Sequence, residues 1–171
     1  MRVFLVRHGD ADADIPEGLE DDARALTSRA RQALPSHFEK LLSRMGTPHL
    51  ILMSPLVRAV QTATLLGQAL QYEGPMRANR TLFPDGPVGA IEGLLADKLG
   101  ETIILVGHQP SMGATAAHFL GLPAFPKPVQ PGTVIGIERP DDNLAAGKLI
   151  FYAAVGQPIF EGSLQEAPSA V

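Results

Sequence analysis

The stretch Val3-Phe4-Leu5-Val6-Arg7-His8-Gly9 opens the chain and decides how the rest is interpreted. Valine and phenylalanine favour a pleated, buried strand, and a short apolar run bounded by glycine is typical of a strand inside a sheet. The polar pair Arg7 and His8 therefore begins where the strand ends. In open α/β sheets, ligands bind just outside the carboxyl ends of the strands, so this pair is a candidate site. A basic edge residue and a capping histidine are the simpler alternative.

Two further apolar runs end in a similar way. Leu50-Ile51-Leu52-Met53 meets Ser54-Pro55, a pair typical of a helix start, so Ser54 is expected as the N-cap of a helix that carries Arg58 one turn in. Residues 102–106 form another buried strand, which runs into Gly107-His108-Gln109-Pro110. Each of the three junctions therefore brings a basic side chain close to the end of a strand.

The rest of the pattern predicts more helices and a hairpin. Thr27 is expected to cap a helix that runs to Met45 with a kink or break at Pro35, and His37 is expected on its surface. Ser111 is expected to cap the helix after the third strand. Residues 74–89 are expected to be irregular, and residues 90–99 to form a helix with Leu99 turned inward. Residues 133–138 and 148–154 are expected to form the two strands of a hairpin. The hairpin implies a mixed sheet.

An acidic segment follows the first strand. Residues 10–22 contain seven acidic side chains and little apolar periodicity, which predicts a loop. A solvated, charged loop is the simpler interpretation, and a lid or rim beside His8 is the functional alternative.

Composition limits the class of protein. The 171 residues suit one domain with a sizeable core, and the formal net charge of -4 argues against nonspecific nucleic-acid binding. The lack of cysteine excludes thiol catalysis, disulfides and cysteine-bound metals. No stretch reaches the length of a membrane span and the N-terminus has no signal-peptide pattern. We therefore expect a cytoplasmic protein with no nucleic-acid or membrane partner.

The residues at the three junctions suit phosphate chemistry. Right-handed crossovers would bring Arg7, His8, Arg58 and His108 to one edge of the sheet. Guanidinium groups match phosphate oxygens, and helix N-termini add backbone donors. Neighbouring positive charge favours the neutral form of at least one imidazole, whose nitrogen is then a good nucleophile toward phosphorus. A metal site is the competing interpretation of the two histidines, but the arginines would repel a cation, so no metal or cofactor is expected.

In this order, the three motifs resemble the histidine phosphatase superfamily, which has the phosphoglycerate-mutase-like fold. They are Arg7-His8-Gly9, residues 54–63 (SPLVRAVQTA) and residues 106–110 (VGHQP). The small size and Arg7-His8-Gly9-Asp10-Ala11 are similar to the SixA-type phosphohistidine phosphatase branch. The resemblance implies an α/β protein with a three-layer α/β/α sandwich and a mostly parallel mixed sheet. It also implies a single domain over residues 1–155 and a C-terminal tail over residues 156–171.

The resemblance implies roles for individual residues. His8 would be the nucleophile and become transiently phosphorylated, while Arg7, Arg58 and His108 would hold the phosphoryl oxygens. Gly9 and Gln109 would lie against the substrate.

One departure concerns the general acid. Many relatives carry an acidic residue where this chain has Leu82-Phe83-Pro84, so Asp85 and Asp10 are the candidates that remain. Phosphohistidine has a labile P–N bond and needs less protonation of its leaving group than an alcohol ester does. The expected function is therefore dephosphorylation of phosphohistidine on a phosphotransfer protein. A phosphatase of small phosphate monoesters and a non-catalytic phosphate-binding module stay open as alternatives.

Overall fold

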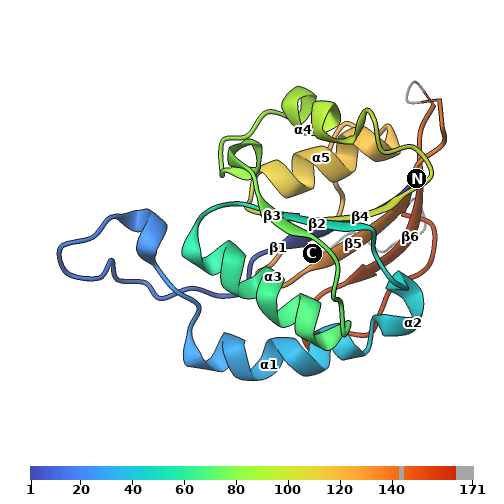
Figure 1. Ribbon diagram of the computed structural model, residues 1–171. Helices are drawn as coiled ribbons and strands as arrows, with labels where there is room; N and C mark the ends of the chain where they lie inside the picture. Colours follow the sequence, from blue (N-terminus) through green and yellow to red (C-terminus); the bar gives the residue numbers. More distant parts are fainter. Residues whose placement is uncertain (143–144, 165–171) are drawn as a thin grey trace.

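The computed structural model describes residues 1–142 and 145–164, which form one six-stranded sheet between two layers of helices (Figure 1). The strand order is β3-β2-β4-β1-β5-β6, and β5 alone runs against its neighbours. The strands are β1 (Arg2–Arg7), β2 (Leu50–Met53), β3 (Met76–Ala78), β4 (Thr102–Gly107), β5 (Val134–Glu138) and β6 (Lys148–Ala153). The expected α/β sandwich with a mostly parallel mixed sheet is confirmed.

Helices cover both faces of the sheet, as Figure 1 shows. One layer holds α1 (Ser28–Glu39), α2 (Leu42–Met45) and α3 (Val57–Ala69), and the other holds α4 (Val88–Leu95) and α5 (Ser111–Leu120). Two short 3-10 turns complete the elements: η1 (Asp21–Ala23) and η2 (Arg80–Leu82).

The apolar residues of β1 contribute to the hydrophobic cores on both faces of the sheet. Val3 and Leu5 belong to the core under α4 and α5, whereas Phe4 and Val6 belong to the core under α1 and α3. Successive side chains of a strand point to opposite faces, so a strand covered on both sides must be apolar at every position. This is why the first strand could be predicted from its unbroken apolar sequence.

Several expectations about element boundaries are wrong. Neither serine caps its helix: α3 begins at Val57 with Leu56 as N-cap, and Ser111 is itself the first residue of α5. The first helix passes through Pro35 without a break and ends at Glu39, because buried Leu34 and Phe38 on either side of the proline hold that turn against the sheet.

Three further expectations, about residues 74–89, Leu99 and His37, are wrong. The segment over residues 74–89 is not wholly irregular, since β3 pairs with β2 at the edge of the sheet. Leu99 lies beyond the end of α4 and is 60% exposed. His37 is buried rather than on the surface, and its Nε2 donates to the Gly132 carbonyl at 2.9 Å.

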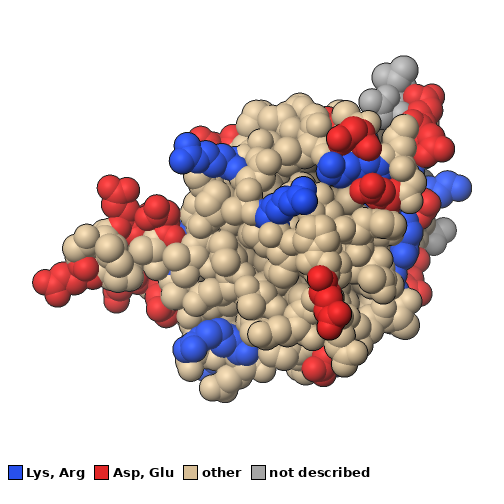
Figure 2. All heavy atoms as spheres, viewed as in Figure 1, with Lys and Arg blue, Asp and Glu red and all other residues tan. Residues whose placement is uncertain are grey.

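The acidic segment after β1 projects from the body of the protein. In Figure 1 it is the extended loop that carries η1, and Figure 2 shows red acidic side chains gathered on this projection. The two ends of this projection meet at its base, where Ala11 forms a bridge with Leu26, next to Thr27, the N-cap of α1.

The C-terminal segment begins by packing on the sheet. Tyr152 and Phe160 form a bridge, and Phe160 contacts the core under α5. Phe160, which lies in the expected tail over residues 156–171, thus packs beside β6, and residues 165–171 lie outside the described part. No helix of the described residues is long and apolar enough to cross a membrane.

Candidate active site

The register of two central strands puts the two histidines side by side. Arg7 pairs with Gly107 in the parallel β1–β4 ladder, so His8 and His108 each follow the last paired position. The backbone N–H of His8 donates to the Gly107 carbonyl at 3.0 Å, and the ring centroids of the two histidines are 4.9 Å apart. Both side chains are buried, at 9% and 2% exposed, in a region where buried polar groups need specific partners.

The tautomer of His8 follows from its partner. Its Nδ1 lies 2.6 Å from the Gly9 carbonyl oxygen, and a carbonyl can only accept, so Nδ1 carries the proton. Burial, and then the cations of Arg58, Arg7 and Arg24, lower the pKa of His8 to about 4, although the Gly9 carbonyl opposes them. The ring is therefore neutral at pH 7, with an unprotonated Nε2.

Gly9 is fixed by its surroundings. Its N–H donates to Thr62 Oγ1 at 2.9 Å, and Thr62 donates to the Arg58 carbonyl at 2.7 Å. A side chain at Gly9 would begin 2.6 Å from a methyl of Leu34, so a larger residue here would displace this buried leucine of α1. Gly9 therefore links the His8 ring, through its carbonyl, to Thr62 of α3, through its N–H.

Two arginines complete the cluster. Arg58 lies in the first turn of α3 and is 4% exposed, and Arg7 donates through Nη1 to the Val129 carbonyl at 2.8 Å. Burial lowers the pKa of Arg7, while Asp10 opposes that shift. The sheet and α3 thus bring together the four residues that the sequence singled out.

Three polar atoms of this cluster are buried and have no hydrogen-bond partner among the described residues. They are Arg7 Nε, Arg58 Nε and His108 Nδ1. Only two other buried side-chain atoms of the described part share this condition, Thr115 Oγ1 and Thr133 Oγ1. Buried polar atoms without a partner are rare in folded proteins, and a cluster that includes two guanidinium donors fits an anionic ligand with several oxygens.

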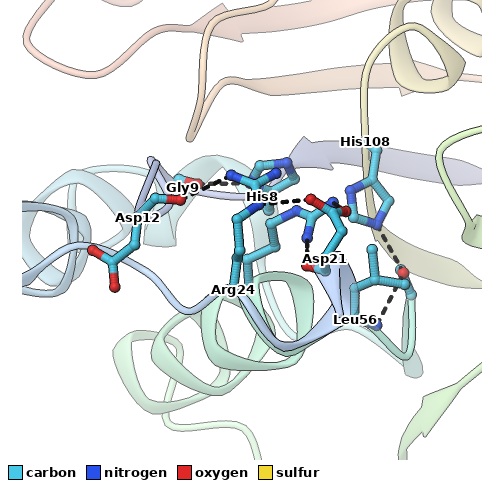
Figure 3. A network of polar contacts seen from close by, with 9 residues as sticks. His8, Gly9, Asp12, Asp21, Arg24, Leu56 and His108 are labelled. Carbon is cyan, nitrogen blue, oxygen red and sulfur yellow. Dashed lines mark hydrogen bonds and ion pairs between the residues drawn. The ribbon is translucent and has the colours of Figure 1, made fainter. Parts of the chain in front are cut away.

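Asp21 of the acidic segment and Arg24, two residues after its end, join the site, and neither was singled out from the sequence. Asp21 accepts from Arg58 Nη2 at 3.2 Å through its carboxylate and from Arg58 Nη1 at 3.0 Å through its carbonyl. Arg24 binds the Asp21 carboxylate at 2.7 Å, and Figure 3 shows Asp21 between Arg24 and His108. Hydrogen bonding to Arg24 and the charge of Arg58 hold the pKa of Asp21 below its usual value.

The other expected residues take varied positions. Gln109 Oε1 accepts from the Gly113 N–H at 2.7 Å, so its side chain is engaged with α5. Asp10 is exposed and close enough to Arg7 to raise its pKa. Asp85 is also exposed, and its carboxylate forms no hydrogen bond or ion pair with the described residues. Within the described part, no group of three or more His, Asp or Glu side chains could hold a metal ion.

Comparisons with known proteins find relatives in sequence and in fold. The phosphohistidine phosphatase SixA of Escherichia coli (strain K12) is 28% identical over 120 residues, which cover 68% of this chain and 73% of SixA. A solved structure of the protein histidine phosphatase SixA complexed with tungstate has the same fold, with a TM-score of 0.79, 23% identity, and coverage of 90% of this chain and 97% of that one.

In sequence and in fold, the chain is similar to the histidine phosphatase superfamily. An uncharacterized protein of Picosynechococcus sp. (strain ATCC 27264 / PCC 7002 / PR-6) is 33% identical over 129 residues, which cover 68% of this chain and 71% of that protein. No family model matches the chain.

Proposed function

We propose that this protein removes the phosphoryl group from phosphohistidine on a phosphotransfer protein, with His8 as the nucleophile. The observation that carries the proposal is the neutral, Nδ1-protonated His8 ring beside two arginines and a second histidine that each have a buried nitrogen without a partner among the described residues. The Nε2 lone pair would form a bond to phosphorus while the bond from phosphorus to the substrate imidazole breaks, and the leaving imidazole takes a proton from solvent. Water would then attack phosphorus and return the electron pair to Nε2.

The same three side chains would stabilise the transferring group. Arg7, Arg58 and His108 surround the place that the phosphoryl oxygens would occupy, and preorganised donors are the largest contribution that such a site makes to phosphoryl transfer. No step requires a metal ion or cofactor.

The choice of substrate rests on the leaving-group side of the site. A general acid must hold a proton, yet Asp21 is kept ionised by two arginines and Asp85 lies exposed. An imidazole leaves phosphorus with much less protonation than an alkoxide needs. This arrangement supports a phosphoramidate substrate over a phosphate ester.

A groove beside the site offers room for a large substrate. It has a volume of about 500 Å³ and runs along α5. It starts at Gln109 and Val129, which adjoin His108 and Arg7, and reaches Lys127. A protein that carries the phosphohistidine could place its neighbouring residues there. A cytoplasmic location stays a prediction from the sequence.

Hydrolysis rates on two substrates test the choice. The phosphohistidine form of a phosphotransfer protein and a sugar phosphate would be compared under the same conditions. We expect a clearly higher kcat/KM on phosphohistidine, and equal or better activity on the sugar phosphate would overturn the proposal in favour of a small-ester phosphatase.

A nucleophile variant tests the chemistry itself. His8→Ala should lower the hydrolysis of an aryl phosphate at least about a thousandfold, because no other group can form the covalent intermediate. His49→Ala is the control and should keep wild-type activity, because His49 is an exposed histidine just before β2, at the opposite end of that strand from the site. If wild type and His8→Ala are equally inert while wild type binds phosphate, the protein is a binding module.

A further inference from the structure

Ser54 has a buried hydroxyl that the fold does not use for capping. It directly follows β2, it is 0% exposed, and its Oγ lies 2.8 Å from His108 Nε2 and 3.3 Å from the backbone nitrogen of Leu56. The helix it was expected to cap begins two residues after Pro55, with no side-chain cap. The hydroxyl therefore serves the histidine rather than the helix.

The proton of this hydroxyl has one place to go. The Leu56 N–H donates to Oγ, so that contact uses an oxygen lone pair. The hydroxyl hydrogen still needs an acceptor because the group is buried, and the acceptor within hydrogen-bond distance is His108 Nε2. If Ser54 donates to Nε2, that nitrogen carries a lone pair, and the proton of the neutral ring sits on Nδ1.

The other nitrogen of His108 is the orphaned one. Nδ1 is buried with no partner among the described residues, and in Figure 3 it faces the side of the site where Asp21 lies. Burial, and then the nearby positive groups, lower the pKa of His108 to about 3, so the ring carries a single proton at pH 7. A protonated Nδ1 in this place is a donor without an acceptor.

We propose that Ser54 is a positioning residue that holds His108 in the Nδ1–H tautomer, so that His108 donates a hydrogen bond to a phosphoryl oxygen. Both histidines are then protonated on Nδ1, but His8 acts through its unprotonated Nε2 and His108 acts through its Nδ1–H. The Gly9 carbonyl holds the proton of His8 on Nδ1 and leaves Nε2 as a nucleophile. The Ser54 hydroxyl occupies Nε2 of His108 and leaves Nδ1–H as a donor. The hydrogen bond from His108 to a phosphoryl oxygen rests on the proposed function, whereas the tautomer of His108 does not.

The tautomer can be read directly by NMR. Long-range ¹H–¹⁵N correlation spectra of the ¹⁵N-labelled protein at pH 7 distinguish protonated from unprotonated ring nitrogens, and the variants His8→Gln and His108→Gln assign the signals. We expect His108 to carry its proton on Nδ1 in the wild type and in Ser54→Thr, which keeps the hydroxyl. In Ser54→Ala, the proton should redistribute toward Nε2. A wild-type His108 with its proton on Nε2 overturns the inference, whether or not the variants fold.

Kinetics separate positioning from structure. Ser54→Ala should lower kcat about tenfold with little change in KM, because the lost contact matters most when charge develops on phosphorus. Ser54→Thr should restore most of the activity. The matched control is Ser111→Ala, which removes another buried serine that bonds the Gly86 carbonyl instead of a histidine. Equal losses in both alanine variants overturn the inference.

The two proposals can fail separately. If His108 shows the expected tautomer but the protein does not hydrolyse phosphohistidine, the proposed function is wrong and the role of Ser54 in holding the tautomer stands. If hydrolysis is efficient but the tautomer is the opposite one, only the inference about Ser54 is wrong.

Discussion

At the scale of single residues, the carboxylate of Asp21 contacts one of the cations of the site. Asp21 contacts both terminal nitrogens of Arg58, the atoms that a phosphoryl group would also address. The carboxylate is 57% exposed, whereas the Arg58 side chain is 5% exposed. A bound phosphoryl group must therefore compete with Asp21 for the buried guanidinium.

Removing the charge of Asp21 should strengthen anion binding. Asp21→Asn is expected to tighten the binding of inorganic phosphate about two- to fivefold, a modest gain because an exposed ion pair is weak. Isothermal titration calorimetry at low ionic strength would measure it. Asp14→Asn is the control, since it removes the same charge from the same exposed segment away from Arg58. Equal tightening in both variants would mean that only the general field of the segment matters.

At the scale of elements, α3 supports the end of β1 through one hydroxyl. Thr62 accepts from the Gly9 N–H and donates to the Arg58 carbonyl, so it connects the residue that holds His8 to the helix that carries Arg58. Both neighbours are buried, and the loss of this hydroxyl would leave the Gly9 N–H without a partner.

Thr62→Val tests this connection. The variant keeps the shape of the side chain and should lower the free energy of unfolding by about 1–3 kcal/mol, the usual effect of a buried donor left unpaired. It should also reduce phosphatase activity, because Gly9 orients His8. Thr64→Val, on the exposed side of the same helix, loses only a bond to the Val60 carbonyl and should change stability by less than about 0.5 kcal/mol. Urea denaturation measures both, and equal effects would argue against the connection.

At the scale of the whole molecule, buried histidines should make stability depend on pH. The pKa values of His8 and His108 are lowered from 6.5 to about 4 and about 3, and burial also lowers the pKa of His37. Between pH 6.5 and about 4, the unfolded chain binds more protons than the folded one, so stability falls as the pH falls through that window.

Acid titration of stability measures this effect. We expect the free energy of unfolding to be lower at pH 5 than at pH 7, by about 1–2 kcal/mol for each of His8 and His108, with His37 acting in the same direction. The difference should shrink in His108→Gln. An unchanged urea midpoint between the two pH values would show that the histidines titrate normally in the folded protein.

The sequence alone determined the central architecture and four residues of the site. The strands β1, β2 and β4 are buried on both faces, so their sequences are apolar throughout, and the change to polar residues marks where each strand ends. The junctions after these strands carry Arg7, His8, Arg58 and His108, which makes their convergence predictable from the direction of the crossovers.

Only the tertiary structure decided which partners these residues have. The sequence gives no periodic signal that Ser54 contacts His108, that Asp21 returns to Arg58, or that His37 is buried against Gly132, because each pair is joined across different elements. Local propensity assigned Ser54 and Ser111 to helix caps, and long-range hydrogen bonds gave them other partners. A strand pattern reflects burial along one segment, whereas a proton's position depends on which groups the whole fold brings within 3 Å.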